Sequence, residues 1–196
     1  GKSSDEIMTM LGKPGVHPEG RFLPDTYIIP RSGQQSQILQ LAANAMDRAL
    51  ADTWESREAN LPLQSAEQLL ILASIVEKET GQAFERPQIA GVFVRRMQKG
   101  MRLQTDPTII YGMGESYQGN IRKKDLRTDT AYNTYTRSGL PPTPIAMPGQ
   151  AALTASAHPA KGDDLYFVAK GNGEHYFSPS YKEHQKAVNQ YQLNKK

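Results

Sequence analysis

The strongest constraint on the fold is a nearly unbroken apolar run near the middle of the chain. Within residues 69–76, with the sequence LLILASIV, only Ser74 is polar. Ser65 followed by Gln68 is typical of the start of a helix, and Gly81 is typical of its end. A helix that is apolar on almost every side has to be buried. The sequence therefore predicts a fold built around this one helix.

The last turn of this predicted helix carries two carboxylates, Glu77 and Glu79, on either side of Lys78. That end of a helix is the negative end of its dipole, so an ionised carboxylate is disfavoured there and its pKa rises. A carboxyl group that keeps its proton can serve as a general acid. At about 100° per residue, Glu79 falls between the bulky Leu72 and Ile75, which slightly favours Glu79 as the drier group. Two solvated charges at a helix end are the alternative.

Composition narrows the classes of function. The chain has 196 residues, 38% hydrophobic and 22% charged, which suits one soluble domain with a real core. The net charge is +3, and basic residues form no stripe interleaved with aromatics, so we expect no nucleic-acid partner. The absence of cysteine excludes disulfides and thiolate chemistry. No pair of histidines has the spacing of a helical zinc site, and we expect neither metal nor cofactor.

Targeting features are missing from the sequence. No stretch approaches the roughly 18 apolar residues of a membrane helix, and no signal peptide is present. Because the chain begins with Gly1, we expect it to be a fragment whose targeting signal lies upstream. Residues 1–20 are predicted to be a helix and loop that end a truncated upstream region, and residues 21–196 to be the main domain.

Further elements are predicted around the central helix. A β-hairpin is expected over 165–178, where two apolar runs flank a glycine-rich turn, and a short strand over 101–105. Arg95 and Arg96 fall on the polar side of a predicted helix and are expected to be solvated. The fold class is therefore α+β, with helices around the buried glutamate-bearing helix and a small antiparallel sheet. The other predicted helices are 3–11, 32–60, 84–99, 149–157 and 180–193, besides a brief one that ends at Tyr111.

Polar side chains suited to sugars follow the central helix. Gln104 and Thr105 offer an amide and a hydroxyl that can bond sugar hydroxyl and N-acetyl groups. Asp106 precedes Pro107, so it is expected to cap a helix, to line a cleft, or to do both. Residues 132–135 place two tyrosines around an amide and a hydroxyl, a pattern that also fits a plain strand.

Several short motifs follow one another along the chain. They are PDTY at 24–27, ASIVEKET at 73–80, RLQTDPTIIYG at 102–112, AYNTY at 131–135, GLPP at 139–142 and AHPA at 157–160. In this order and at these spacings they resemble the YceG-like family of endolytic murein transglycosylases. The resemblance runs from about Glu19 to the C-terminal helix. Each motif alone is a weak signal, whereas the ordered set is specific.

The resemblance implies a catalytic domain over 21–196 with a lysozyme-like site, in which a glutamate at a helix end faces a sheet-lined groove. The second glutamate of the EKE motif is the catalytic acid in the family, so Glu79 is expected to take that role. The residues expected to bind substrate beside it are Gln104, Thr105, Asp106, Tyr132, Asn133, Thr134 and Tyr135.

The implied reaction is lytic cleavage of the MurNAc-β-1,4-GlcNAc bond in nascent peptidoglycan strands. It leaves 1,6-anhydroMurNAc ends and uses one carboxylate as acid and then as base. The implied partners are glycan strands and, as candidates, peptidoglycan synthases. The implied location is the periplasmic face of the inner membrane, with an anchor upstream of this soluble fragment. Two alternatives are a muramidase that uses Asp106 or Glu77 as a second carboxylate, and a non-catalytic wall-binding or scaffold module.

Overall fold

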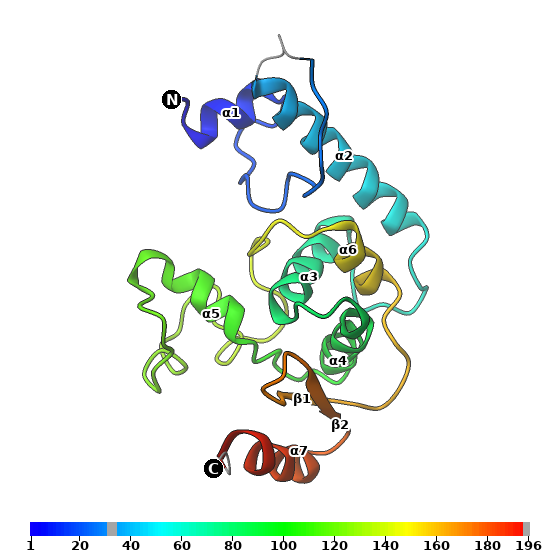
Figure 1. The fold of residues 1–196 in the computed structure, drawn as a ribbon, viewed down its shortest axis with the longest axis vertical. Coiled ribbons are helices and arrows are strands. Elements are labelled where there is room, and N and C mark those ends of the chain that lie inside the picture. Colours follow the sequence, from blue (N-terminus) through cyan, green and yellow to red (C-terminus); the bar gives the residue numbers. More distant parts are fainter. Residues whose placement is uncertain (31–34, 194–196) are drawn as a thin grey trace.

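The computed structural model describes residues 1–30 and 35–193 (Figure 1). Its α-helices are α1 (Ser4–Met10), α2 (Gln35–Glu55), α3 (Ala66–Glu79), α4 (Arg86–Gln98), α5 (Asp106–Met113), α6 (Gln150–Ala157) and α7 (Tyr181–Val188). Two strands, β1 (Tyr166–Ala169) and β2 (His175–Ser178), form a hairpin. Short turns of other helix types are η1 (Ala83–Glu85), η2 (Gly114–Ser116) and η3 (Asn189–Leu193).

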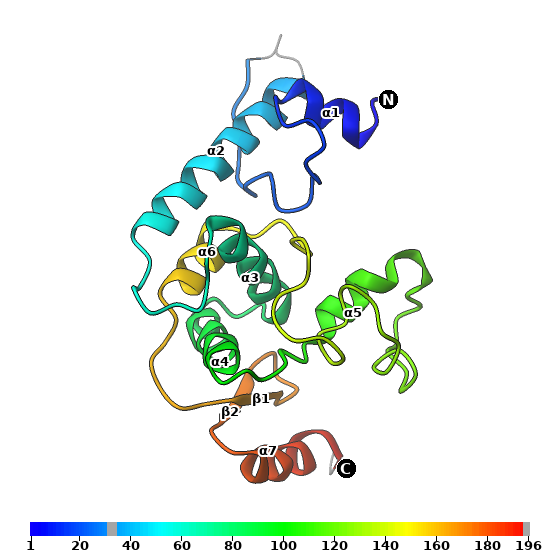
Figure 2. The ribbon, with the colours of Figure 1, turned by 180° about the vertical axis from the view of Figure 1, so that it is seen from behind.

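Helix α3 lies at the centre of the molecule. Every residue from Leu69 to Val76 is buried, and the helix packs against α2, α4, α5 and α6. Figures 1 and 2 show α4 and α6 beside it from both sides. The buried Ser74 is satisfied, because its hydroxyl donates to the Ile71 carbonyl and accepts from the Ile145 amide. The predicted buried central helix is confirmed.

Most helix starts agree with the capping patterns. Ser65 accepts a hydrogen bond from the Gln68 amide at the start of α3, and Ser3 forms a reciprocal capping box with Glu6 before α1. Ser180 caps α7 in the same way as Ser65 caps α3. The predicted start of the second helix at Ser32 lies outside the described residues. Helix α2 ends at Glu55, earlier than predicted, where the Ser56 hydroxyl donates to carbonyls of the last turn.

The predicted hairpin is confirmed. Its strands are antiparallel, with Tyr166 opposite Ser178 and Ala169 opposite His175, and they make up the whole sheet within 1–30 and 35–193. Helix α7 packs against both strands at one end of the molecule. The predicted strand over 101–105 is wrong, because the amides of Gln104 and Thr105 bond to Thr134 in a turn instead of to a neighbouring strand. The fold is mostly helical with a small antiparallel sheet.

The expectation that Arg95 and Arg96 are solvated is wrong. Arg96 is only 8% exposed and donates to the carbonyls of Leu103 and Leu165. Arg95 donates to the carbonyl of Asp164. A guanidinium carries several donors on a long stem, so each side chain reaches past α4 to backbone carbonyls of other segments. These bonds fix the segments before α5 and β1 against α4.

The N-terminal residues pack on the side of α2. Met8 and Leu11 form a small buried cluster with Ala43, separate from the core around α3. The division of the chain at residue 20 stays a prediction. Across the parts of the chain that the structure describes, none of the helices has the length and apolar character that crossing a bilayer requires.

Candidate active site

Helix α3 ends at Glu79 because the backbone of Thr80 is extended, with φ −143° and ψ 139°. The Thr80 hydroxyl accepts from the Gln82 amide at 2.9 Å and donates to the Glu85 carboxylate at 3.0 Å. Gly81 was expected to end the helix, but it is not among the residues in the left-handed conformation. The extended Thr80 ends the helix instead, and Glu79 stands at the tip of α3.

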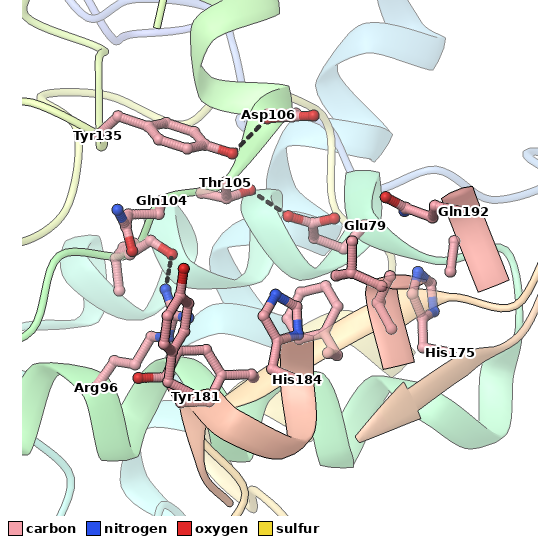
Figure 3. A pocket seen from close by; sticks show the side chains of 16 residues that line it. Glu79, Arg96, Gln104, Thr105, Asp106, Tyr135, His175, Tyr181, His184 and Gln192 are labelled. Carbon is pink, nitrogen blue, oxygen red and sulfur yellow. Dashed lines mark hydrogen bonds between the residues drawn. The ribbon is translucent and has the colours of Figure 1, made fainter. Parts of the chain in front are cut away.

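A cleft of about 370 Å³ opens beside the tip of α3 (Figure 3). One wall is made by the end of α3, the segment before α5 and the turn that carries Tyr135. The other wall is made by the hairpin, α7 and η3. The residues that line it are Glu79, Arg96, Leu103, Gln104, Thr105, Asp106, Tyr135, Tyr166, Phe167, Val168, Ala169, His175, Tyr181, His184, Val188 and Gln192. A space of this size with a few converging polar groups is typical of a ligand site.

Burial raises the pKa of Glu79 from 4.5 to about 7. The negative charge of Asp106 adds to the rise in pKa, whereas a hydrogen bond from the Thr105 hydroxyl and the positive charge of Arg96 oppose it. The predicted direction of the pKa shift is confirmed, and its main cause is loss of contact with water. Near neutral pH this carboxyl group can both give and take a proton.

Glu77 has a different environment, although it lies only two positions before Glu79 in the sequence. Its carboxylate accepts the Gly149 amide at 3.1 Å and contacts the Arg86 guanidinium at 3.4 Å. Gly149 is the N-cap residue of α6, so Glu77 joins the end of α3 to the start of α6. It does not line the cleft.

Gln104 has an unusual backbone. Its φ is 52°, in the left-handed region that residues with a side chain rarely occupy. Its amide donates to the Thr134 carbonyl, and the Thr105 amide donates to the Thr134 hydroxyl. These bonds hold the strained conformation, and the exposed Gln104 side chain lies in the cleft. Strain that is fixed in this way is common at functional sites.

The expectation that Asp106 caps a helix is wrong. The N-cap position of α5 belongs to Thr105, and Asp106 is the first helical residue, where its charge still suits the helix dipole. Its carboxylate accepts the Tyr135 hydroxyl at 2.6 Å, as the dashed line in Figure 3 shows. Burial and this bond to Asp106 raise the pKa of Tyr135. The structure therefore brings Gln104, Asp106 and Tyr135 together around Glu79.

Tyr132, Asn133 and Thr134 are near the site but do not line the cleft. The Tyr132 ring lies 5.0 Å from the Tyr111 ring, and the Thr134 hydroxyl bonds to the Thr105 amide. Residues 131–136 form turns, so the alternative of a strand is wrong. The amide of the buried Asn133 donates to the carbonyls of Asp125, Leu126 and Thr128. All three side chains thus hold the loop that carries Tyr135.

The hairpin wall was missed by sequence reasoning. Its aromatic side chains in the cleft are Tyr166, Phe167, His175, Tyr181 and His184. No short motif contains them. One face of the predicted last helix carries Tyr181, His184 and Val188, and this helical spacing was the sequence signal that could have indicated the wall. Which face meets the cleft depends on packing that the spacing does not reveal.

A buried carboxylate joins the two walls of the cleft. Glu85 is only 2% exposed and accepts hydrogen bonds from the Thr80 hydroxyl and from the His175 backbone amide, the latter at 2.7 Å. Nδ1 of His175 lies 2.9 Å from the same carboxylate. Burial acts to raise the pKa of Glu85, but these bonds hold it below its usual range. Glu85 thus ties the end of α3 to the start of β2.

No group of three or more histidine, aspartate or glutamate side chains with the arrangement of a metal site occurs in the described ranges. The side chains that face the cleft offer proton transfer and hydrogen bonding. A single carboxyl group with a pKa near 7 is the group best suited to chemistry there.

Comparison with known proteins gives a consistent picture. The profile of the YceG-like family matches residues 2–190. An endolytic murein transglycosylase of Bacillus subtilis (strain 168) is 39% identical over 89% of this chain and 48% of its own length. One from Streptococcus pneumoniae (serotype 2, strain D39) is 34% identical over 87% of this chain and 31% of its own. The chain therefore spans half or less of the length of these relatives.

A solved structure agrees with the family match. The crystal structure of a YceG-like protein from Listeria monocytogenes superposes with a TM-score of 0.75 at 34% identity. The match covers 92% of this chain and 62% of that one.

Proposed function

This chain belongs to the YceG-like family, and on that premise we propose that it cuts peptidoglycan as an endolytic murein transglycosylase does. The bond is the β-1,4 link from N-acetylmuramic acid to N-acetylglucosamine, and the product carries a 1,6-anhydromuramyl end. The observation that carries the proposal is the carboxyl group of Glu79, which lines a cleft and has a pKa of about 7.

In the proposed mechanism Glu79 acts twice. The protonated carboxyl first gives its proton to the bridging oxygen, and the bond from that oxygen to C1 of the muramic residue breaks. The resulting carboxylate then takes the proton of the C6 hydroxyl while O6 forms a bond to C1. Glu79 ends protonated again, and no water is consumed. A pKa near the working pH suits a group with both tasks.

The other residues of the cleft are proposed to bind and orient the sugars. The Gln104 amide and the Asp106–Tyr135 pair offer hydrogen bonds beside Glu79. Thr105 donates to the Glu79 carboxylate and so sets its orientation. Tyr132, Asn133 and Thr134 are proposed as positioning residues, since their side chains support the loop and the backbone of the site.

Hydrolysis is the second candidate reaction. Asp106 is an exposed carboxylate in the same cleft as Glu79, and two carboxylates are what most glycoside hydrolases use. Tyr135 already donates to the Asp106 carboxylate, which makes Asp106 less available as a second catalytic group and favours the lytic reaction. Glu77 is a weaker candidate for the second catalytic carboxylate, because it already accepts hydrogen bonds from the Gly149 amide and the Arg86 guanidinium.

In the whole protein, we propose that this domain faces the periplasm from an anchor in the inner membrane. Its substrate, peptidoglycan, lies outside the cytoplasm. Cleavage within nascent strands would bring it close to peptidoglycan synthases, which are the partners that we propose.

Mass spectrometry of peptidoglycan digested by this chain tests the proposal. We expect muropeptides that end in 1,6-anhydroMurNAc, which are lighter by one water than hydrolytic products. Products with reducing MurNAc ends would show that the chain is a hydrolase and not a lytic transglycosylase. If the peptidoglycan is not digested at all, the chain is instead a binding or scaffold module.

A further inference from the structure

The proposed mechanism uses one wall of the cleft and leaves the wall of the hairpin and α7 without a role. On that wall the rings of Tyr166 and His184 are stacked, with centroids 5.2 Å apart and planes 23° apart. The Tyr181 ring lies 5.9 Å from that of Tyr166. The Arg96 guanidinium lies over the Tyr166 ring at 5.0 Å. Tyr166 is thus held between Arg96 and His184, and it fixes the His184 ring.

The two ring nitrogens of His184 have different surroundings. Nδ1 is buried and has no hydrogen-bond partner in the part of the chain that the structure describes. Burial and the charge of Arg96 lower the pKa of His184, which favours the neutral form of the ring. A buried lone pair without a partner is tolerated better than a buried N–H without one. The proton therefore belongs on Nε2, the nitrogen left for a ligand.

His184 is aimed at the space where a substrate would lie. Figure 3 shows its ring projecting from α7 into the cleft, below the carboxyl group of Glu79. A neutral N–H donor suits an uncharged carbonyl acceptor. An uncharged acceptor also avoids the repulsion that Asp106 and the ionised form of Glu79 would exert on a carboxylate in this cleft.

Tyr181 offers a flat apolar face at the rim of the same wall. It is 59% exposed although it lines the cleft and is a large aromatic residue. The C–H groups on one face of a sugar ring pack well on such a surface, and the phenol hydroxyl stays in water. A stacking face beside a neutral donor is complementary to an N-acetylated sugar.

We propose that Tyr181 and His184 form a subsite for one N-acetylated sugar of the glycan, next to the bond that is cut. Tyr181 stacks on the sugar ring, and Nε2–H of His184 donates to the carbonyl of the acetamido group. Tyr166 and Arg96 hold the His184 ring from behind. This subsite rests on the proposed function, because it assigns one residue of the same glycan substrate.

Binding of two uncharged oligosaccharides tests the subsite. Chitotetraose carries acetamido groups and cellotetraose carries hydroxyl groups at the same positions. Titrations by calorimetry or NMR use the Glu79→Gln protein, in which no cleavage can obscure binding. Three further variants each add one substitution to the Glu79→Gln protein: Tyr181→Ala, Tyr181→Phe or His184→Phe. The phenylalanine at position 184 keeps a flat ring on Tyr166. Tyr176→Ala is the control, since Tyr176 is 42% exposed and lies outside the cleft.

We expect Tyr181→Ala to weaken binding of both sugars by about fivefold or more, as loss of an aromatic contact does. Tyr181→Phe and Tyr176→Ala should bind like the parent. His184→Phe should weaken the binding of chitotetraose by about tenfold, as loss of one hydrogen bond does, and leave the binding of cellotetraose unchanged. Equal binding by all variants overturns the subsite, and so does an absence of chitotetraose binding by the parent. A His184→Phe effect of the same size on both sugars overturns the acetamido contact.

These results are independent of those that test the reaction. If the unaltered chain releases anhydro ends while all variants bind like the parent, the subsite is wrong and the proposed function stands. If Tyr181→Ala and His184→Phe bind as expected but no anhydro ends appear, the subsite stands and the proposed reaction is wrong.

Discussion

Replacing Glu79 with glutamine should stabilise the fold at neutral pH. The pKa of Glu79 rises from 4.5 in the unfolded chain to about 7 in the fold, so the folded state disfavours the ionised form. A rise of this size corresponds to about 3 kcal/mol. Below pH 4.5 the group is protonated in both states and this cost is absent. It grows as pH rises from 4.5 to 7 and is then constant.

The Glu79→Gln variant carries no such charge, and its amide oxygen can still accept the Thr105 hydroxyl. Its advantage over the unaltered protein should therefore be larger at pH 8 than at pH 4.5 by about 3 kcal/mol, or roughly 6 to 12 °C in Tm. Urea or thermal unfolding of both proteins at the two pH values measures this difference. Because both proteins contain the same other titratable groups, the contribution of those groups cancels in the difference between the two stabilities.

Glu77→Gln is the matched control. It should lower stability, because it weakens the contact of Glu77 with Arg86 and its bond to the Gly149 amide. An advantage of Glu79→Gln that is the same at both pH values, or a variant less stable than the unaltered protein at pH 8, would refute the reasoning. In that case the carboxylate of Glu79 would have to be well solvated or ion-paired.

Three further predictions concern residues around Glu79. Asp106→Asn removes a charge that raises the pKa of Glu79, so the alkaline limb of the kcat/KM profile should move to lower pH; an unmoved limb would count against the coupling. Glu85→Gln should cost about 2 kcal/mol at pH 7 in urea unfolding. That cost should shrink as pH falls through the pKa of Glu85, and a pH-independent cost would contradict this. Asn133→Ala should cost about 2 to 4 kcal/mol, because backbone carbonyls lose the donor that its amide supplies; an unchanged urea midpoint would show that water replaces it.

The parts of the fold that follow from local pattern could be predicted from the sequence. The apolar run 69–76 leaves no polar face and so has to be buried, and the capping pattern of Ser65 and Gln68 before it indicates a helix. The end of such a helix also lies where buried structure meets solvent, which made a raised pKa of Glu79 an expectation, but the burial that mainly causes the rise comes from packing in the fold. The hairpin at 165–178 was equally local, because its turn residues leave few alternatives.

Other features depend on contacts between distant segments. Residue types at 132–135 suit a strand and a turn equally, and the turn forms because the Asn133 amide bonds to backbone carbonyls of its own loop. Arg96 looks solvated by helical spacing, yet its length lets it reach carbonyls that only the folded chain brings near. The wall that carries His184 becomes part of the cleft only when the hairpin and α7 dock.

The role that is expected of a side chain can also change when a helix begins one residue earlier or later. The sequence does not reveal whether a helix begins at one residue or at the residue before it. Helix α5 begins one position earlier than predicted, so Asp106 lies in its first turn and not at its N-cap. Its carboxylate is then available to Tyr135. Resemblance to a family supplied the candidate residues here, and the packing decided which of them face the cleft.

The central claim, that Glu79 alone transfers the protons, is tested most directly by the rate at which anhydro ends form. The measurement compares the unaltered chain with Glu79→Gln and Glu77→Gln on the same peptidoglycan. We predict that Glu79→Gln lowers the rate at least about a hundredfold, the usual scale for loss of a general acid–base group, while Glu77→Gln retains most of the activity. The opposite ranking, or a Glu79→Gln protein with nearly full activity, would contradict the account.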